Sequence, residues 1–131
     1  MRILVTGSRD WSSWAAVERA LDDAVSDRET EITTVVHGGC PDGADHVADV
    51  IASRAGYVVE VHEADWRVNG KAAGFIRNQE MVDAGANFCL AFLMPCKKSG
   101  CRKPQPHDSH GTADCVKRAR AAGITVREYH E

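Results

Sequence analysis

Short apolar runs rich in β-branched residues alternate along this chain with longer segments of helical periodicity, and this alternation restricts the fold most strongly. Such a pattern is expected of consecutive βαβ units, whose strands pair in parallel. The predicted strands are Arg2–Thr6, Ile32–Val36, Val58–Val61, Phe88–Leu93 and Ile124–Glu128. The sequence therefore predicts a three-layer α/β fold, with about five parallel strands in one sheet and helices on both of its faces.

The composition of the predicted strands indicates their order in the sheet. The first, second and fourth runs are nearly all apolar, as is expected of central strands that are covered on both faces. Glu60 in the third run, and Thr125 and Arg127 in the fifth, are polar residues typical of edge strands. This distribution favours the strand order 3-2-1-4-5.

Helical stripes of apolar residues are expected to pack against the sheet. The first two stripes are Trp14, Val17, Leu21 and Val25, followed by Ala44, Val47, Ala48, Ile51 and Ala55. Gly56, Gly85 and Gly123 each follow a helical segment and precede a strand, where a left-handed residue commonly ends a helix.

The composition is that of one ordinary globular domain, with 131 residues of which 44% are hydrophobic and 27% charged. We expect a single domain over residues 1–131, with an insertion containing cysteine and histidine at about 94–111. No apolar run approaches the roughly 20 residues of a membrane span, and the start lacks a cleavable signal pattern. We therefore expect a cytoplasmic protein without a membrane partner. The formal net charge of −3 argues against a general polyanion-binding surface.

The loop after the first predicted strand is a candidate ligand site. In open parallel sheets, ligands bind beyond the carboxyl ends of the strands, near the point where the strand order reverses. Here the chain offers a glycine for a tight turn, a hydroxyl and a guanidinium suited to a phosphate. These candidate residues are Gly7, Ser8 and Arg9. The alternative is a plain helix entry, capped by Asp10, Ser12 or Ser13.

The loop after the second predicted strand carries three glycines within seven residues, directly before a strong helical pattern. Its backbone N–H groups could approach a phosphate at the positive end of that helix. The loop is neither a Walker loop nor the Gly-x-Gly-x-x-Gly fingerprint. The candidate ligand residues are Gly38, Gly39, Asp42, Gly43 and Asp45. The alternative for either aspartate is a helix cap, and His37 is expected to be packed at the strand end without a catalytic part.

Two further segments offer groups to the same edge. Residues 70–81 open a helix whose first half is poorly amphipathic. Arg77 and Met81 lie one turn apart on this helix, so they could present a cation and a polarisable apolar contact to one ligand. The alternative is a solvated face carrying a surface salt bridge. Gly111 and Thr112 begin the last predicted helix, where a hydroxyl would lie beside free N–H groups.

Taken together, these motifs resemble the YpsA-related branch of the SLOG superfamily, whose wider membership includes the LOG phosphoribohydrolases and the DNA-processing DprA proteins. The matching segments are Gly7-Ser8-Arg9, His37-Gly38-Gly39, Gly43-Ala44-Asp45, and Gly74 through Arg77-Asn78 to Met81. The resemblance covers the chain outside residues 94–110. It implies a Rossmann-like sheet that binds nucleotides or nucleotide-derived ligands, and a homo-oligomer with a dimer favoured. Similar compact proteins occur in bacteria and phages, which would place a phage protein in the host cytoplasm.

The LOG enzymes imply an alternative function, the hydrolysis of a nucleotide N-glycosidic bond. Arg77 and Gly111-Thr112 match positions in their scheme, whereas the position of their catalytic glutamate falls on Cys115. Asp114 is displaced from that position by one residue, or about 100° around the helix. Cys115 belongs instead to an apolar stripe made of Thr112, Cys115, Val116, Ala119 and Ala122. The candidate catalytic residues are Arg77 and Asp114, with Glu80 as a substitute carboxylate if its helix turns it inward.

The insertion holds two thiols and two imidazoles within fifteen residues, which is the donor set of a Cys2His2 zinc site. The candidate ligands are Cys96, Cys101, His107 and His110. Residues 97–110 carry no apolar side chains of their own, so a structural Zn²⁺ could order a segment that burial cannot. The alternatives are a mobile loop and a reversible disulfide. We expect Cys40, Cys89 and Cys115 to lie in or beside core elements and not to bind metal.

A basic cluster in the insertion leaves a choice between ligand classes. Its members are Lys97, Lys98, Arg102 and Lys103. The cluster could steer or cover an anionic ligand. It could also contact single-stranded DNA, although few aromatic side chains are available for base stacking. We expect Trp14 in the core, and Trp11 and Trp66 near the ligand edge. The leading hypothesis is a sensor or sequestering protein for a nucleotide-like small molecule.

Overall fold

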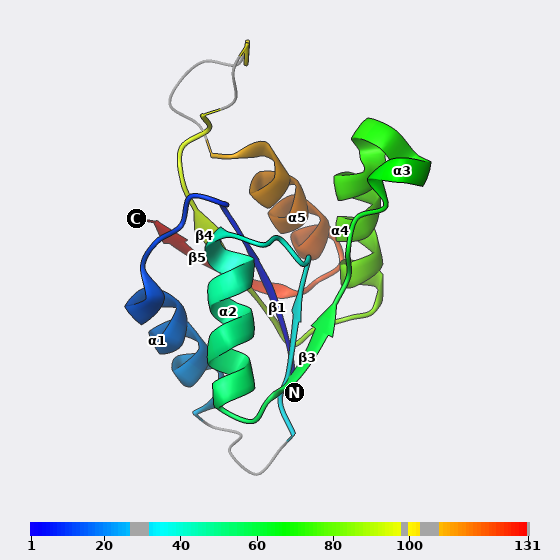
Figure 1. The fold of residues 1–131 in the computed structure, drawn as a ribbon. Coiled ribbons are helices and arrows are strands. Elements are labelled where there is room, and N and C mark those ends of the chain that lie inside the picture. The colour runs from blue at the N-terminus through cyan, green and yellow to red at the C-terminus, as the bar shows by residue number, and fades with distance from the viewer. Residues whose placement is uncertain (27–31, 98–99, 103–107, 131) are drawn as a thin grey trace.

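A computed structural model describes residues 1–26, 32–97, 100–102 and 108–130 of the chain. Figure 1 shows strands and helices alternating along the chain, as the sequence predicts. The strands are β1 (Arg2–Gly7), β2 (Thr34–His37), β3 (Val58–Val61), β4 (Phe88–Leu93) and β5 (Thr125–His130). The helices are α1 (Trp14–Val25), α2 (Gly43–Arg54), α3 (Trp66–Asn69), the 3-10 turn η1 (Gly70–Ala72), α4 (Ala73–Asp83) and α5 (His110–Ala121).

The five strands form one parallel sheet in the order β3-β2-β1-β4-β5, which confirms the predicted fold class and strand order. Strand boundaries differ from the prediction by one or two residues in β1, β2 and β5. β2 begins at Thr34 because Ile32, which the sequence placed in the strand, is 78% exposed. β5 extends to His130 because it continues to pair with β4 as far as Leu93.

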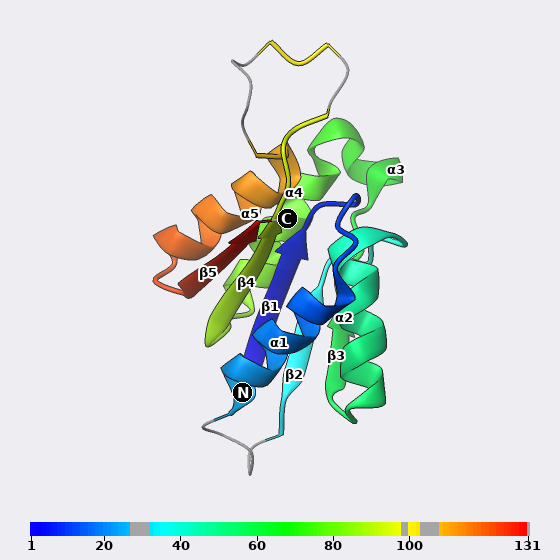
Figure 2. The ribbon, with the colours of Figure 1, turned by 90° about the vertical axis from the view of Figure 1, so that its left-hand side faces the viewer.

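Helices cover both faces of the sheet, as the apolar stripes predict. α1 and α2 pack together on one face, and α4 and α5 pack together on the other (Figures 1 and 2). Successive side chains of β1 therefore point to opposite layers: Ile3 and Val5 pack with α1 and α2, whereas Leu4 packs with Met81 of α4 and Cys115 of α5. This alternation makes both faces of the central strands apolar.

The ends of the helices follow the predicted signals. Ser13, one of three candidate caps, caps α1 by accepting a hydrogen bond from the amide of Ala16 at 3.2 Å. Gly56, Gly85 and Gly123 all adopt positive φ after their helices, as expected. The predicted stripes extend one residue too far in two helices, because Ala55 and Ala122 are exposed where α2 and α5 end.

The structure reverses the predicted roles of two tryptophans. Trp11 is only 3% exposed and its ring meets that of Phe92 edge-on, with 5.2 Å between centroids. Trp14 is 42% exposed and contacts the ring of His46 on α2. The reason is that α1 begins at Trp14, so the loop before it folds back over the sheet and buries Trp11. The prediction of Trp14 in the core and Trp11 at the ligand edge was therefore wrong.

Among the described residues, every helix is too short or too polar to cross a membrane.

Candidate functional site

A cleft of about 930 Å³ opens at the carboxyl edge of the sheet. It lies where the strand order reverses, so that loops following β1, β2 and β4 converge there with α4, as predicted. The sequence-predicted ligand residues among its lining are Gly7, Ser8, Arg9, Gly38, Gly39, Asp45, Arg77, Asn78, Met81, Gly111 and Thr112. Asp42 and Gly43, which were also predicted, do not line it.

The loop after β1 is fixed by the backbone of Ser8. Its N–H donates to the carbonyl of Phe92 at 3.0 Å, and its carbonyl accepts from the amides of Trp11 and Ala44, both at 3.2 Å. These bonds join the loop to β4 and to α2. Arg9 follows directly, is exposed and lines the cleft, so its guanidinium is held at the mouth by a rigid backbone.

The start of α2 is filled by protein and is not an open anion site. Gly43 has a φ of +71°, and a Cβ there would collide with the carbonyl of Ser8 and the backbone of Arg9. A Cβ on Gly7 would likewise collide with Ala44. The glycines at 7 and 43 therefore allow two loops to pack closely. The amide of Ala44 at the amino end of α2 donates to Ser8 and is therefore not available to the phosphate that the sequence analysis placed there.

Arg77 of α4 reaches across the cleft to the loop after β2. Its Nη1 donates to the carbonyl of Gly38 at 2.6 Å, and its Nε donates to Oδ1 of Asn78 at 3.1 Å. The guanidinium lies so close over Gly38 that a Cβ there would overlap it. Its Nη2 has no hydrogen-bond acceptor within the described parts of the chain, so this group is available to a ligand in the cleft.

Asn78 ties α4 to the beginning of α5. Its Nδ2 donates to the carbonyl of Gly111 and to Oδ2 of Asp114, both at 3.1 Å. With its oxygen accepting from Arg77, the buried amide of Asn78 is fully engaged with protein. Its evident role is to position the groups on either side of it.

The two carboxylates considered for catalysis lie outside the cleft. Asp114 accepts from Arg118 at 2.8 Å as well as from Asn78, and it faces away from the cleft lining. Glu80 is exposed on α4 and does not line the cleft either. The helix does not turn Glu80 inward, so neither residue is placed to act beside Arg77.

Asp45, which the sequence analysis considered as a ligand residue or a helix cap, is a buried acid that lines the cleft. It is 7% exposed and accepts a hydrogen bond from the amide of Cys40 at 3.2 Å. Burial raises the pKa of Asp45 above its ordinary value, and the nearby His37 and Arg77 oppose this effect. A buried acid with a raised pKa beside an arginine is a feature typical of functional sites.

His37 supports this loop from behind and does not line the cleft. Its Nδ1 accepts from the amide of Gly39 at 3.0 Å, so the ring proton lies on Nε2, which is 2.7 Å from Oδ2 of Asp49. The position agrees with the expectation of a histidine packed at a strand end.

The opening of α5 presents backbone donors for which the described residues offer no acceptor. Its N-cap residue Ser109 makes no side-chain cap, and the first amide bonded back to it is that of Ala113 at 3.0 Å. Within the described residues, no acceptor meets the amides of Gly111 and Thr112, both of which line the cleft. Such amides carry the partial positive charge of a helix terminus and suit an anion.

The wall formed after β3 was predicted only in part, because Trp66 was expected near the ligand edge whereas Lys71 and Phe75 were not named as ligand residues. Trp66 of α3, Lys71 of η1 and Phe75 of α4 all line the cleft, and Trp66 is 53% exposed. The sequence analysis took its phosphate-binding loops from those after strands one, two and four, and added Trp66 and the segment 70–81 to the same edge. The sequence feature that indicates this wall is the presence of Trp66 and Lys71 beside the polar first half of segment 70–81. The fold brings these residues to the cleft.

The charges along the cleft favour an anion. Four cationic side chains line it, and three acidic side chains accompany them, of which one is Asp45 with its raised pKa. The cations are Arg9, Lys71, Arg77 and Lys97, and the acids are Asp10, Asp45 and Glu63. Of the predicted basic cluster, Lys97 is in the cleft wall, Arg102 is exposed outside it, and Lys98 and Lys103 fall outside the described residues.

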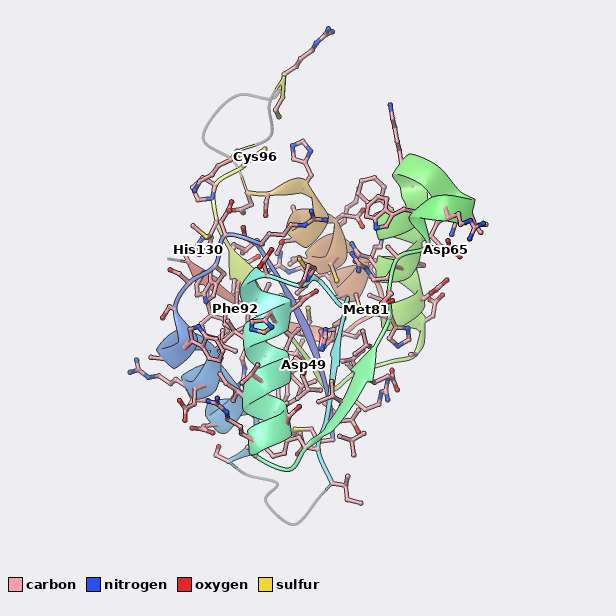
Figure 3. The ribbon with its side chains drawn as sticks, in the orientation of Figure 1. Asp49, Asp65, Met81, Phe92, Cys96 and His130 are labelled. Atoms are coloured by element: carbon pink, nitrogen blue, oxygen red, sulfur yellow. The ribbon has the colours of Figure 1, made fainter. Side chains whose placement is uncertain are left out.

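Three of the four predicted metal ligands lie together at the foot of the insertion, where Figure 3 labels Cys96. The Sγ atoms of Cys96 and Cys101 are 3.6 and 3.4 Å from Nε2 of His110. All three donor atoms lie within 4.8 Å of one another, close enough to hold a metal ion. His107 falls outside the described residues.

The buried thiols of Cys89 and Cys115 lie away from this cluster, in the layer between the sheet and α5. Their mutual hydrogen bond raises the pKa of Cys89 and lowers that of Cys115. Cys115 belongs to the apolar face of α5, as its spacing predicts, and contacts Thr6 of β1.

Comparisons with known proteins identify relatives of the chain. A family model described as "YAcAr: YspA, cpYpsA-related SLOG family" matches residues 1–68. The chain is 43% identical over 130 residues to a protein named Gene 61 protein, from Mycobacterium phage D29. That match covers 95% of this chain and 93% of the phage protein, whose name states no activity. No solved structure matches the chain.

Proposed function

The chain belongs to the YspA, cpYpsA-related SLOG family, and from this premise we propose that its cleft binds a nucleotide or a nucleotide-derived ligand. The observation that carries the proposal is the convergence of cations and free amides at one sheet edge. Arg9, the open Nη2 of Arg77 and the amides of Gly111 and Thr112 belong to three separate segments, yet all line one cleft. Together they supply the charge-assisted hydrogen bonds that phosphate oxygens accept.

The aromatic side of the cleft suits the remainder of a nucleotide. Trp66 and Phe75 are exposed large rings that line the cleft, and Trp66 stands over Gly74. An exposed indole offers a stacking surface that is worth about 1–3 kcal/mol per base. We place phosphates toward Arg9 and the opening of α5, and the base toward Trp66. Binding without turnover corresponds to a sensor or a sequestering protein.

Replacement of Arg9 by alanine tests the phosphate side. The side chain of Arg9 is exposed and makes no hydrogen bond or ion pair with the parts of the chain that the structure describes, so we expect Arg9→Ala to fold normally. Loss of one charged hydrogen bond costs about 1.5–3 kcal/mol, so the affinity for a ligand such as AMP or ADP-ribose should fall about 10- to 100-fold. Isothermal titration calorimetry measures this change.

Arg19→Ala is the matched control, because Arg19 is exposed on α1 and does not line the cleft. It removes the same charge from the protein and should leave the affinity within about twofold, as expected of a screened distant charge. Equal losses from the two variants would assign the effect to net charge and would contradict the placement of the phosphate at Arg9.

A second candidate function, hydrolysis of an N-glycosidic bond, is favoured by Asp45. In this reaction the bond between C1′ and the base breaks, water adds its oxygen to C1′, and a proton reaches the leaving nitrogen. A carboxyl with a raised pKa can hold that proton, and Asp45 lies in the cleft with Arg77, unlike Asp114 and Glu80. Asp45 therefore takes the part that the sequence analysis gave to those two residues.

Asp45→Asn distinguishes hydrolysis from binding. If the chain is a hydrolase, the wild type should release free base from AMP, and the variant should lose at least about 100-fold in rate, as expected when an acid catalyst is removed. Chromatography of the products measures the release. Binding of AMP by the wild type without release of adenine at high protein concentration would exclude this second function.

The proposal includes a structural zinc ion at Cys96, Cys101 and His110. Two thiolates and an imidazole are donors that zinc prefers over magnesium or calcium. Native mass spectrometry of the purified protein, compared with the same sample denatured, should show one ion's excess mass. Cys101→Ser should remove this excess, whereas Cys40→Ser, which changes a thiol outside the cluster, should retain it.

A further inference from the structure

We infer that metal occupancy at Cys96, Cys101 and His110 controls the affinity of the neighbouring cleft for its anionic ligand. The inference rests on the proposed zinc site and on the proposed anion-binding cleft. It adds to them a coupling between two binding sites within one chain. The argument depends on the geometry of the three donors and on the residues that adjoin them.

The three donors fit one tetrahedral ion. Zinc–sulfur bonds of about 2.3 Å and zinc–nitrogen bonds of about 2.1 Å place the sulfur and nitrogen atoms about 3.6 Å apart in a tetrahedron. The distances from Nε2 of His110 to the two sulfurs are 3.6 and 3.4 Å. An ion could therefore enter with little movement of the side chains.

The two arms of the insertion, residues 96–97 and 108–111, each carry a metal ligand and form part of the cleft wall, whereas the third ligand, Cys101, does not line the cleft. Lys97, the neighbour of Cys96, lines the cleft, and so do Ser109 and Gly111, the two neighbours of His110. His110 is moreover the first residue of α5, and Gly111 and Thr112, whose amides meet no acceptor among the described residues, line the cleft. An ion held by Cys96 and His110 thus fixes both a cation and the helix terminus that the anion would contact.

Among the described residues, the start of α5 is tied to α4 by Asn78, which donates to the carbonyl of Gly111, and the segments that carry Cys96 and His110 are joined at their base. The two arms meet through a single antiparallel bridge between Pro95 and Asp108, and through the amide of Ser109, which donates to the carbonyl of Met94 at 3.0 Å. Cross-linking by a metal is therefore expected to order the wall substantially, as it does in other small segments without an apolar core.

If the metal orders the wall before the anion binds, the affinity of the cleft for the anion increases. The reason is that metal binding has already offset the loss of conformational entropy, so less of that loss accompanies anion binding. Couplings of this kind typically amount to about 5- to 150-fold, and they are reciprocal between the two ligands. We accordingly expect removal of zinc to weaken AMP binding by about tenfold or more, and AMP to strengthen zinc binding by the same factor.

The first arm of the experiment uses metal alone. Hydrogen exchange of the full chain is followed by mass spectrometry with zinc and after its removal by a chelator. Zinc should slow exchange at the amides of residues 109–113 and leave α1 unchanged. Cys101→Ser should show no such zinc-dependent protection; Cys101 does not line the cleft, so this variant leaves the anion-contacting groups in place. Equal exchange with and without zinc in the wild type would overturn the inference, whatever the cleft binds.

The second arm measures AMP affinity by calorimetry, with and without zinc. The expected loss on zinc removal is about tenfold or more in the wild type, and His110→Ala should show that loss even with zinc present. His46→Ala is the matched control, because His46 lies on α2 outside the cleft and the cluster. An AMP affinity independent of zinc would overturn the coupling. No AMP binding by the zinc-loaded wild type would count against the proposed ligand class, and the metal-only arm would still decide the inference.

Discussion

Replacement of Gly43 by alanine is expected to lower the free energy of unfolding by about 2–5 kcal/mol. The positive φ of this residue costs an alanine about 1–2 kcal/mol, and the added Cβ would have to displace the backbone of Ser8 and Arg9, an overpacking that costs about 1–3 kcal/mol. Denaturant unfolding followed by circular dichroism measures the loss. The variant should also weaken ligand binding, because the displaced loop carries Arg9.

Gly111→Ala provides the control for this prediction. Its Cβ would meet no atom of the described residues within 4 Å, and its φ is not positive, so alanine is expected to leave stability unchanged or to raise it by up to about 1 kcal/mol through helix propensity. Equal stability of the two variants would contradict the prediction that Gly43 is required for the close packing of the loops after β1 and β2.

Trp11→Ala should cost about 3–5 kcal/mol, the range for truncating a large buried side chain. Trp11 packs among core residues and against the ring of Phe92. Trp14→Ala should cost only about 1 kcal/mol, because Trp14 is half exposed. Circular dichroism is the suitable signal, since each variant removes a fluorophore. A larger loss from Trp14→Ala would restore the assignment made from the sequence and contradict the structure.

The strand order and the layers could be predicted because they depend on patterns spread over many residues. The nearly apolar runs of β1, β2 and β4 suit central strands, because both faces of a central strand are covered by helices. Glu60 suits the edge strand β3, where its carboxylate lies 2.7 Å from the guanidinium of Arg2. The position of the cleft could be predicted from the same strand order, because ligands bind at the sheet edge near the point where that order reverses.

Contacts between separate loops could not be predicted in the same way. The sequence shows glycines at positions 7 and 43, but whether a glycine admits a ligand or another loop depends on what lies beside it in space. The burial of Trp11 and the exposure of Trp14 likewise depend on where α1 begins. The carboxyl of Asp45 interacts with His37, Cys40 and Arg77, and Arg77 is brought near it only by the fold.

The pairing of Cys96 and Cys101 with His110 lies between these cases. The donor types and their closeness in sequence predicted a metal site, and the structure brings three of the four donors together. The connection of that cluster to the cleft could not be predicted, because it depends on Lys97 and Gly111 facing the same cavity.

Calorimetric titration of the zinc-loaded wild type with AMP, ADP-ribose and a cyclic dinucleotide tests the central claim most directly. The claim predicts saturable binding of at least one of these ligands, and a rise in melting temperature with the same ligand, since binding to the folded state alone stabilises it. The absence of both heat and a melting shift for all three ligands would contradict the assignment of the cleft to nucleotide binding.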